Sequence, residues 1–355
     1  MMIGIDQVEL TQEQDDAVNR LARLRDRVQT LGGYAGTGKT TVIRHLVNRL
    51  GGFAVCAYTG KAAQVLRRKG VAANTIHSTI YRPIQLPNGG VEFVLREPDE
   101  FLYDGAIVDE ASMVSKEIYD DLVALDVPLI FVGDHGQLEP VGAGGFNLME
   151  KPQITLERIH RNAGTIAQFA EYLRHGNDAK NWRRDSNEAV HIISGQELAE
   201  SSGSVGGADQ IIVAFNRTRC EINAMAREER EFEVGVPVVG DRVICLQNDR
   251  RVGIFNGMQG TIHAIDPKRK DITFEANGQQ FRVKYNPEAF GAERTPDRKS
   301  GLIPFDWAYC ITCHKAQGDE FDHVLVLEQV CSKWDHKRWA YTAASRAKNR
   351  LTWVV

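Results

Sequence analysis

The sequence predicts an α/β protein whose parallel sheets are interrupted by a β-hairpin and by a small β-barrel. Short apolar runs alternate with segments of helical spacing along most of the chain, which is typical of parallel strands joined by crossover helices. An Asn-Gly pair between two extended runs predicts the hairpin, and a series of short strands over residues 235–290 predicts the barrel. The 355 residues are enough for two or three compact units.

The composition is that of a globular protein, with 43% hydrophobic and 25% charged residues. No apolar run reaches the roughly 18 residues that cross a bilayer, and residues 1–10 lack a signal pattern, so we expect a cytoplasmic protein. A net charge of −4 is unusual for a nucleic-acid binder, although such binding needs only a local basic groove. Cys310 and Cys313 form a C-x-x-C pair with no second pair, so reduced thiols are favoured over a metal site.

The first half of the chain alternates helices and strands. Residues 12–31 are predicted to be helical, because Val18, Leu21 and Val28 recur with other apolar residues at helical spacing. A glycine-rich segment then opens a second predicted helix, Thr41–Leu50. The other predicted elements are a helix over Lys61–Lys69 and buried strands over Phe53–Tyr58, Ala106–Val108 and Leu129–Val132.

Residues 82–98 depart from this alternation. The turn signal at 87–90 (Pro-Asn-Gly-Gly) separates two extended runs, Pro83–Leu86 and Val91–Leu95. Asn-Gly favours a tight hairpin turn, because both central residues need positive φ. The segment is predicted to be a β-hairpin, either one with a task of its own or a surface hairpin without one.

The second half resumes the α/β pattern around an inserted barrel. Strand and helix signals return near Ile154–Leu173 and Ile211–Phe215, and Trp307–Val355 has the same character. We divide the chain into a first lobe over 1–150, a second lobe over 151–230 and 301–355, and an insertion over 231–300. The strands predicted for the insertion, separated by turn signals, are Asp241–Gln247, Gly260–Ile265, Asp271–Glu275 and Gln280–Tyr285.

A phosphate-binding pattern precedes the second helix. Residues 33–40 (Gly-Tyr-Ala-Gly-Thr-Gly-Lys-Thr) fit G-x-x-x-x-G-K-[ST]. The glycines let backbone N–H groups approach phosphate oxygens, and the helix N-terminus adds positive potential. Lys39 is expected to reach the β- and γ-phosphates of ATP, and Thr40 to hold Mg²⁺. The expected nucleotide contacts of the loop are Gly36, Thr37, Gly38, Lys39 and Thr40.

Acidic residues at the end of a later strand complete a hydrolytic site. Asp109 can hold Mg²⁺ through its oxygen atoms, and Glu110 beside it can orient and deprotonate the attacking water. Near the start of the chain, Thr11 and Gln14 form a capping-box pattern. Gln14 can alternatively present its amide to adenine, and the residues alone leave both roles open.

Together with these sites, further segments resemble the superfamily 1 helicases of class B, the RecD-like and Dda-like group. Tyr58, Glu139 and Ser345 depart from the usual residues of the family, but none of them removes a group needed for hydrolysis. The similar segments run in the family's order over nearly the whole chain: 57–63 (motif Ia), 75–78 (the next DNA-contacting motif), 109–113 (with the acidic pair), 133–141 (motif III), 159–161 (motif IV), 312–320 (motif V) and 341–347 (motif VI).

The resemblance implies two RecA-like lobes with ATP between them, a strand-separating pin in the hairpin and an SH3-like barrel. It implies that Gln137 senses the γ-phosphate and that Arg161 and Arg346 stabilise the transition state of hydrolysis. Such arginines raise the rate of hydrolysis by about 10³–10⁵-fold. Glu320 is implied to bind the ribose, and the resemblance favours adenine recognition by Gln14.

A track for single-stranded DNA is implied along the same motifs. Hydroxyl, amide and cationic side chains suit phosphate contacts. Thr75 could instead cap a helix, and His77 could be an interior histidine. Phe93 of the hairpin is the aromatic residue expected against the last base pair, with packing inside the hairpin as the alternative. The other expected DNA contacts are Thr59, Lys61, Thr75, His77, Asn216, Arg217, Thr312, His314 and Lys315.

We therefore expect an ATP-dependent DNA helicase, with 5′ to 3′ movement taken from the resemblance alone. The alternatives are a translocase that displaces bound proteins and an ATPase that remodels RNA. The expected partners are single-stranded DNA, its junctions with duplex DNA, and a single-strand-binding, replication or recombination protein. We expect a monomer that does not bind membranes.

Overall fold

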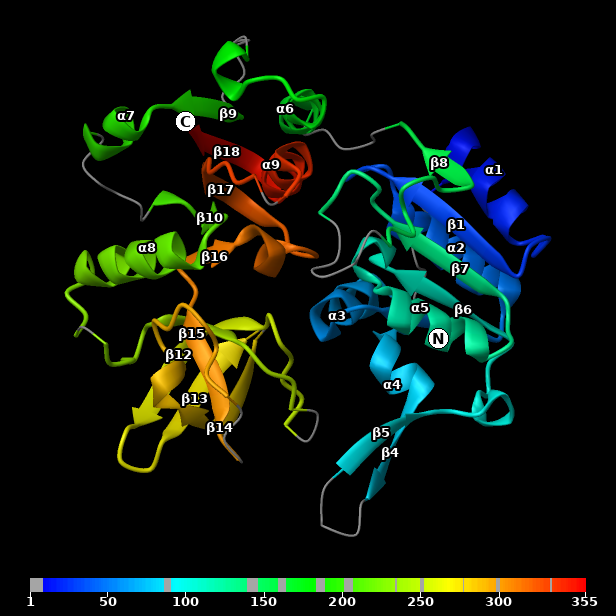
Figure 1. Cartoon of the computed structure of the whole chain (residues 1–355), viewed down its shortest axis with the longest axis horizontal. Helices are drawn as coiled ribbons and strands as arrows, with labels where there is room; N and C mark the ends of the chain where they lie inside the picture. Colours follow the sequence, from blue (N-terminus) through cyan, green and yellow to red (C-terminus); the bar gives the residue numbers. More distant parts are fainter. Residues whose placement is uncertain are drawn as a thin grey trace. The chain divides into compact units, whose positions relative to one another are not determined.

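The computed structural model divides the chain into two compact units, Met1–Asn162 and Ala163–Val355 (Figure 1). No helix among the described residues is long and apolar enough to cross a bilayer. The structure describes residues 9–85, 91–138, 146–158, 164–182, 189–200, 207–233, 235–249, 252–276, 278–297, 301–332 and 334–355.

The first unit is built on a six-stranded sheet in which every pair of neighbours is parallel. This confirms the predicted α/β class. In spatial order the strands are β3 (Asn74–Thr75), β2 (Phe53–Ala57), β6 (Gly105–Asp109), β7 (Leu129–Gly133), β1 (Val28–Gly33) and β8 (Ile154–Leu156). The helices are α1 (Gln12–Leu21), α2 (Lys39–Leu50), α3 (Gly60–Arg68), α4 (Ile76–Ile80) and α5 (Lys116–Ala124).

The prediction of one helix over residues 12–31 is wrong. Helix α1 ends at Leu21, Leu24 takes a left-handed backbone with φ 47°, and Val28 begins the buried strand β1. The helical spacing of apolar residues continues past Leu21, but β1 pairs with both β7 and β8, so sheet formation outweighs the local pattern.

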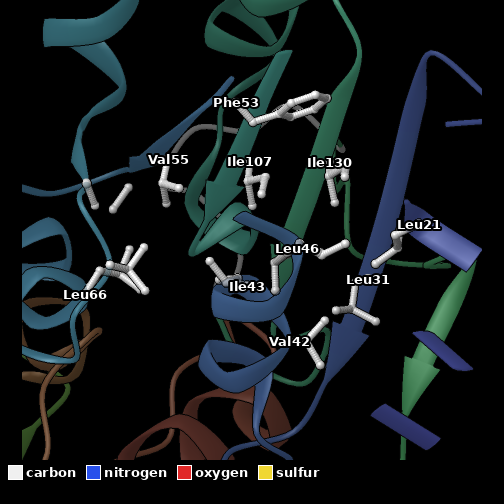
Figure 2. Close-up of a cluster of buried hydrophobic side chains, with 14 of the residues drawn as sticks. Leu21, Leu31, Val42, Ile43, Leu46, Phe53, Val55, Leu66, Ile107 and Ile130 are labelled. Atoms are coloured by element: carbon white, nitrogen blue, oxygen red, sulfur yellow. The ribbon is translucent and has the colours of Figure 1, made fainter. Parts of the chain in front are cut away.

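Apolar side chains alternate between the two faces of the sheet. Ile107 and Ile130 pack on one face with Ile43 and Leu46 of α2 (Figure 2). The residues next to them in the strands point to the other face, where Phe131 packs with the buried residues of α5. Full burial of each large apolar side chain stabilises the fold by about 1.5–3 kcal/mol.

The predicted hairpin is present as β4 (Tyr81–Gln85) and β5 (Val91–Leu95), which pair antiparallel from Tyr81↔Leu95 to Gln85↔Val91. Tyr81 is also the C-cap of α4, so the hairpin continues directly from that helix (Figure 1). The Asn-Gly turn itself lies outside the described residues.

The second unit contains a five-stranded parallel sheet and a closed barrel. Helices α6 (Gly164–Arg174) and α9 (His336–Ala344) share one face of the sheet, because Phe169 and Trp339 both contact Trp353. Helix α8 (Asn216–Glu228) follows β10, and the short helix α7 (Gly195–Glu200) follows β9. In spatial order the strands are β16 (Cys310–Thr312), β10 (Gln210–Val213), β17 (Phe321–Leu327), β18 (Ala347–Val354) and β9 (Val190–Ile193).

The barrel is closed by pairing between its first and last strands, with Val243 opposite Trp307. Its fifth strand lies beyond residue 300, in the stretch that we had assigned to the second lobe from the sequence. That strand runs almost directly into β16, so it serves both as a barrel wall and as the return to the sheet. The strands are β11 (Arg242–Cys245), β12 (Gln259–Asp266), β13 (Asp271–Ala276), β14 (Gln279–Asn286) and β15 (Ile303–Trp307).

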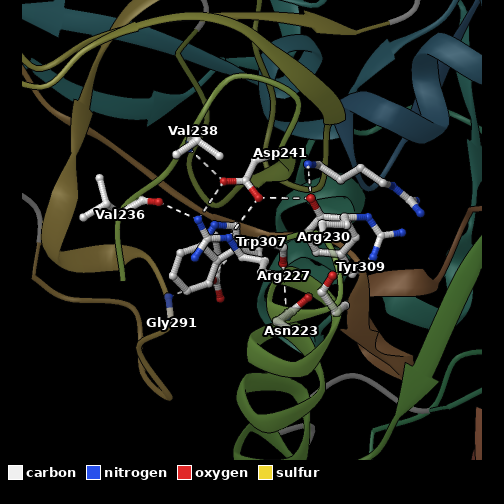
Figure 3. Close-up of polar contacts among 12 residues, drawn as sticks. Asn223, Arg227, Arg230, Val236, Val238, Asp241, Gly291, Trp307 and Tyr309 are labelled. Atoms are coloured by element: carbon white, nitrogen blue, oxygen red, sulfur yellow. Dashed lines mark hydrogen bonds and ion pairs between the residues drawn. The ribbon is translucent and has the colours of Figure 1, made fainter. Parts of the chain in front are cut away.

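A buried ion pair joins α8 to the barrel (Figure 3). Arg227 Nε and Nη2 lie 2.9 and 3.1 Å from the two carboxylate oxygens of Asp241, and these residues are only 2% and 0% exposed. The Tyr309 hydroxyl donates to the same carboxylate at 3.0 Å. The Arg227 guanidinium also lies 4.3 Å from the ring centroid of Trp307. With a fourth bond from the backbone N–H of Val238 at 2.9 Å, each oxygen of the Asp241 carboxylate accepts two hydrogen bonds from the protein.

Arg219 and Asn223 lie on the same face of α8 as Arg227. The three residues are four positions apart, which is about one helical turn. Arg219 pairs with the buried Asp306 of β15. Asn223 accepts a hydrogen bond from Cys310 N at 2.9 Å and donates to the carbonyl of Cys310 at 3.0 Å. The polar stripe of α8, which we define as Arg219, Asn223 and Arg227, thus joins the helix to the start of the first barrel strand, to the last barrel strand and to β16 of the sheet.

Replacement of Arg227 by Ala should lower the free energy of unfolding of the second unit by about 3–5 kcal/mol, because Asp241 would remain buried without its cation. All five tryptophans lie in the second unit, so urea titration followed by tryptophan fluorescence reports on that unit. Arg217→Ala is the matched control on the same helix. Arg217 is paired with Glu221 but its side chain is 80% exposed, so its loss should cost at most about 1 kcal/mol. Equal midpoints for the two variants would contradict this account of the ion pair.

Candidate functional site

Three neighbouring strands of the first sheet, β6, β7 and β1, carry the predicted phosphate site at their carboxyl ends. Their register places Gly32 beside Gly133, and Val108 beside Phe131. The loops that follow these strands therefore leave the sheet side by side. In open α/β sheets this edge is where ligands bind.

The loop after β1 has the conformation that its glycines allow. Gly38 has φ 85° and forms the N-cap of α2, and a Cβ atom there would lie 2.2 Å from Gln14 Nε2. Lys39 Nζ donates to the carbonyls of Gly33 and Tyr34 at 2.8 and 3.0 Å. The backbone N–H groups of the first turn of α2 and the Lys39 ammonium are thus gathered at one end of a helix, which favours an anion.

The acidic pair lies at the end of β6, where Asp109 is the last residue of the strand and Glu110 follows it. Desolvation by burial raises the pKa of Asp109, and a hydrogen bond from the Glu110 backbone and the charge of Lys39 partly oppose that shift. Glu110 has a left-handed backbone, with φ 54° and ψ 40°, which costs about 1–3 kcal/mol in a residue other than glycine. Asp109 and Thr40 offer the hard oxygen ligands that Mg²⁺ prefers, so the donor set fits this metal.

Gln137 lies in the loop after β7 and is held there by Asp134. The buried carboxylate of Asp134 accepts from Gly136 N at 2.9 Å and from Gln137 Nε2 at 3.1 Å. The ring centroids of His135 and Tyr34 are 4.3 Å apart, so this loop also touches the phosphate-binding loop. The supporting role of Asp134 had not been predicted from the sequence, although its place two residues before Gly136 is typical of an Asx turn.

Gln14 is buried between the start of α1 and the phosphate-binding loop. Its Oε1 accepts from Thr11 N at 3.1 Å, and Thr11 Oγ1 accepts from Gln14 N at 3.4 Å, so the predicted capping box is present. Its Nε2 donates to the carbonyl of Thr37 at 3.0 Å. The amide therefore connects the helix cap to the loop.

The expected DNA contacts of the first unit follow the next strands along the same sheet edge. Thr59 and Lys61 come after β2, and Thr75 ends β3. Both threonines are helix N-caps: Thr59 accepts from Ala62 N at 3.1 Å, and Thr75 accepts from Ser78 N at 3.2 Å. The capping alternative for Thr75 is thus present in the structure.

The two expected aromatic contacts near the hairpin are both exposed. The alternative of an interior histidine is wrong for His77, because its side chain is exposed on α4. The ring of His77 lies 5.4 Å from that of Tyr81. Phe93 of β5 is 53% exposed, so more than half of its surface can meet a ligand.

In the second unit, the expected DNA contacts follow β10 and β16, which are parallel neighbours. Asn216 and Arg217 are exposed at the start of α8, whereas Thr312 is buried at the end of β16. Burial lowers the pKa of His314, so its imidazole is neutral at pH 7 and offers hydrogen bonds instead of charge. Lys315 Nζ donates to Asn256 Oδ1 of the barrel at 2.9 Å.

Glu320 and Arg346 directly precede β17 and β18, and these neighbouring strands begin with Phe321 paired to Ala347. Glu320 is exposed. Arg346 is buried, and its guanidinium donates to the carbonyls of Thr342 and Asp319 at 2.9 and 3.2 Å and to Ser345 Oγ at 2.8 Å. Arg161 and Glu139 lie outside the described residues.

Two family models match parts of the chain. Residues 9–195 match the AAA domain, and residues 307–354 match the UvrD-like helicase C-terminal domain. The first match takes in more than half of the chain and contains the phosphate-binding loop, the acidic pair and the Gln137 loop. The second contains β16, β17, α9 and Arg346.

Two DNA helicases are similar to the chain over most of its length. It is 30% identical over 370 residues to the ATP-dependent RecD2 DNA helicase of Deinococcus radiodurans, covering 96% of this chain and 48% of that protein. It is 25% identical over 305 residues to the ATP-dependent DNA helicase dda of phage T4, covering 78% of this chain and 67% of that protein. The chain thus spans about half the length of the first of these relatives.

Solved structures of Pif1 helicases share the fold. A structure of two Pif1 helicases at forked double-stranded DNA has a TM-score of 0.65 and 20% identity, over 97% of this chain and 92% of that one. Pif1 from Bacteroides in complex with ADP-AlF3 and single-stranded DNA has a TM-score of 0.57 and 23% identity, over 97% of this chain and 92% of that one.

Proposed function

Since the chain belongs to the AAA-domain family and to the superfamily 1B DNA helicases, we propose that it is an ATP-driven motor that moves 5′ to 3′ on single-stranded DNA and unwinds duplexes. The observation that carries the proposal is the shared sheet edge. Strands β1, β7 and β6 end at the phosphate-site residues, and the next strands, β2 and β3, end at the expected DNA contacts. A change at the nucleotide can therefore reach the DNA contacts through adjacent loops.

Each hydrolytic role is assigned to a group with suitable chemistry. Lys39 exchanges its bonds to backbone carbonyls for bonds to the β- and γ-phosphates, and Glu110 orients and deprotonates the attacking water. Gln137, held by Asp134, faces the γ-phosphate. Thr40 and Asp109 would hold Mg²⁺, which neutralises phosphate charge when bound.

Arg346 is proposed to stabilise the charge on the transferred phosphoryl group, together with Arg161. A guanidinium has five N–H donors, and the three bonds of Arg346 to its own unit orient the group without using all of them. Glu320 is proposed to bind the ribose.

The DNA contacts are proposed for the polar groups that follow β2, β3, β10 and β16. A capping threonine suits this role, because the oxygen of Thr59 accepts from Ala62 N while its own O–H can donate to a phosphate. The exposed Phe93 supports unwinding over simple displacement of proteins, because an aromatic face can replace the stacking of a separated base pair.

The proposal is tested with duplexes that carry either a 5′ or a 3′ single-stranded tail, in the presence of ATP and Mg²⁺. The 5′-tailed duplex should be unwound, the 3′-tailed one should not, and Lys39→Ala should unwind neither. Displacement of streptavidin without strand separation would favour the translocase, and equal stimulation of hydrolysis by RNA would favour an RNA-remodelling ATPase.

Arg346→Ala should lower DNA-stimulated turnover by about 10³-fold or more, while binding of a non-hydrolysable ATP analogue stays within about threefold. Because Arg346 is also buried, thermal melting must first establish that the variant is folded. Arg346→Lys provides a second variant that keeps the charge but loses the planar fork. Full turnover in either variant would remove the assigned role.

Gln14→Ala should weaken ATP binding about tenfold and GTP binding less. The Gln14 amide has two N–H donors and two oxygen lone pairs, and its bonds to Thr11 and Thr37 use one of each. One donor and one lone pair therefore remain for the edge of adenine, and the variant would lose both bonds. Titration with labelled nucleotides measures both affinities. Gln12→Ala, an exposed glutamine of the same helix, is the control. Equal weakening of ATP and GTP would mean that the amide supports the loop and does not read the base.

Phe93→Ala should slow unwinding about tenfold while DNA-stimulated ATP hydrolysis changes little. Stacking of a base on one aromatic ring contributes about 1–3 kcal/mol, which can offset the loss of about 1.4 kcal/mol of stacking when one base-pair step of the duplex opens. Strand separation and phosphate release are measured on the same forked substrate. Tyr103→Ala removes an exposed aromatic residue outside the hairpin and serves as control. Equal loss of both activities in Phe93→Ala would argue against a wedge.

A further inference from the structure

We propose that Tyr81 is a positioning residue that ties the base of the hairpin to α5 through a hydrogen bond to Asp121, and that this tie holds the hairpin rigid during unwinding. The inference rests on the proposed function for its consequence, but the tie itself is a property of the first unit. It concerns residues outside every motif named above.

Tyr81 connects three parts of the first unit. Its backbone ends α4 and begins β4, where it pairs with Leu95 at the base of the hairpin. Its ring lies 5.4 Å from the ring of His77, an expected DNA contact. Its hydroxyl donates to Asp121 Oδ2 on α5. One side chain therefore joins a DNA contact, the hairpin and a helix of the nucleotide-binding lobe.

The acceptor belongs to a firmly anchored helix. Helix α5 follows Asp109 and Glu110 after one short 3-10 turn, η2 (Ala111–Met113), and a capping serine. Ile118 and Leu122 of this helix are buried against the sheet. A change in the position of the acidic pair can thus be passed along a short, packed path to Asp121.

The bond is well suited to act as a permanent tie. Both partners are half-buried, and the acceptor is a carboxylate, so the bond is charge-assisted and only partly accessible to competing water. Desolvation raises the pKa of Tyr81, and its hydrogen bond to Asp121 raises it further, so the hydroxyl remains a donor at physiological pH.

Within the described part of the hairpin base, the contacts of Arg82 and Arg96 are local. Arg96 bonds to the carbonyls of Thr79 and Ile80 at 3.1 and 2.8 Å, and Arg82 Nε lies 3.0 Å from Glu100 Oε2. These bonds join the hairpin to the segments that directly precede and follow it. The bond from Tyr81 to Asp121 instead spans 40 residues and reaches a different helix. Without it, the hairpin would keep its shape but could tilt about its base.

Tyr81→Phe removes the bond and keeps the ring. We expect unwinding of a forked duplex to slow about tenfold, while DNA-stimulated ATP hydrolysis stays within about twofold, because the hydrolytic groups are untouched. Asp121→Ala should behave in the same way, and the double variant should lose no more than either single one. Asp121→Asn keeps an acceptor oxygen and should retain unwinding. Tyr119→Phe, on the same helix but packed on Phe131, is the matched control.

Hydrogen exchange measured without DNA or nucleotide tests the tie independently of activity. In Tyr81→Phe the amides of β4 and β5 should exchange faster, while those of β6 stay as in the parent protein. Unchanged exchange in the hairpin would overturn the inference, as would unchanged unwinding in a variant whose parent unwinds DNA. If the parent protein itself fails to unwind, the proposed function falls, and the exchange measurement still decides whether Tyr81 holds the hairpin.

Discussion

The register of the parallel strands β1, β7 and β6 is the constraint on which the first unit depends. The same pairing that aligns Gly32 with Gly133 also turns Ile107 and Ile130 toward α2. A shift of one residue would turn every side chain of a strand to the opposite face, so the buried core allows only one alignment. Burial of ordinary aliphatic residues thus determines where the acidic pair and the phosphate-binding loop meet.

The second unit combines two kinds of interaction. Its sheet is held by apolar packing around Trp353, whereas the barrel is attached to α8 through buried ion pairs and a hydrogen bond from the Asn223 amide to the carbonyl of Trp307. Buried ion pairs add little net stability compared with apolar contacts, but they tolerate few alternative geometries. We therefore interpret the polar stripe of α8 as a device that sets the orientation of the barrel on its lobe. The bond between Lys315 and Asn256 adds a second contact between the barrel and an expected DNA-binding segment.

Local patterns were enough to predict much of the fold. The phosphate-binding loop, the acidic pair and the hairpin are each encoded within a few consecutive residues. The end of α1 was not predictable in this way, because Val28 belongs to a strand and not to the helix only through its pairing with Leu129 of β7, which is distant in the sequence. The pairs Arg227–Asp241 and Tyr81–Asp121 join residues 14 and 40 positions apart, and nothing in the spacing of a single sequence indicates such partners. The buried setting of Arg346 likewise depends on how α9 packs against the segment that contains Asp319.

The closed barrel has a consequence for how such a chain can change over evolutionary time. Because its first and last strands are paired, the insertion leaves and rejoins the parallel sheet at nearly the same point, as a surface loop does. Among the described residues, each barrel strand is paired with a strand on either side. A module of this kind can be enlarged or exchanged without disturbing the strand order of its host, provided that its polar partners on α8 and Lys315 are inherited with it.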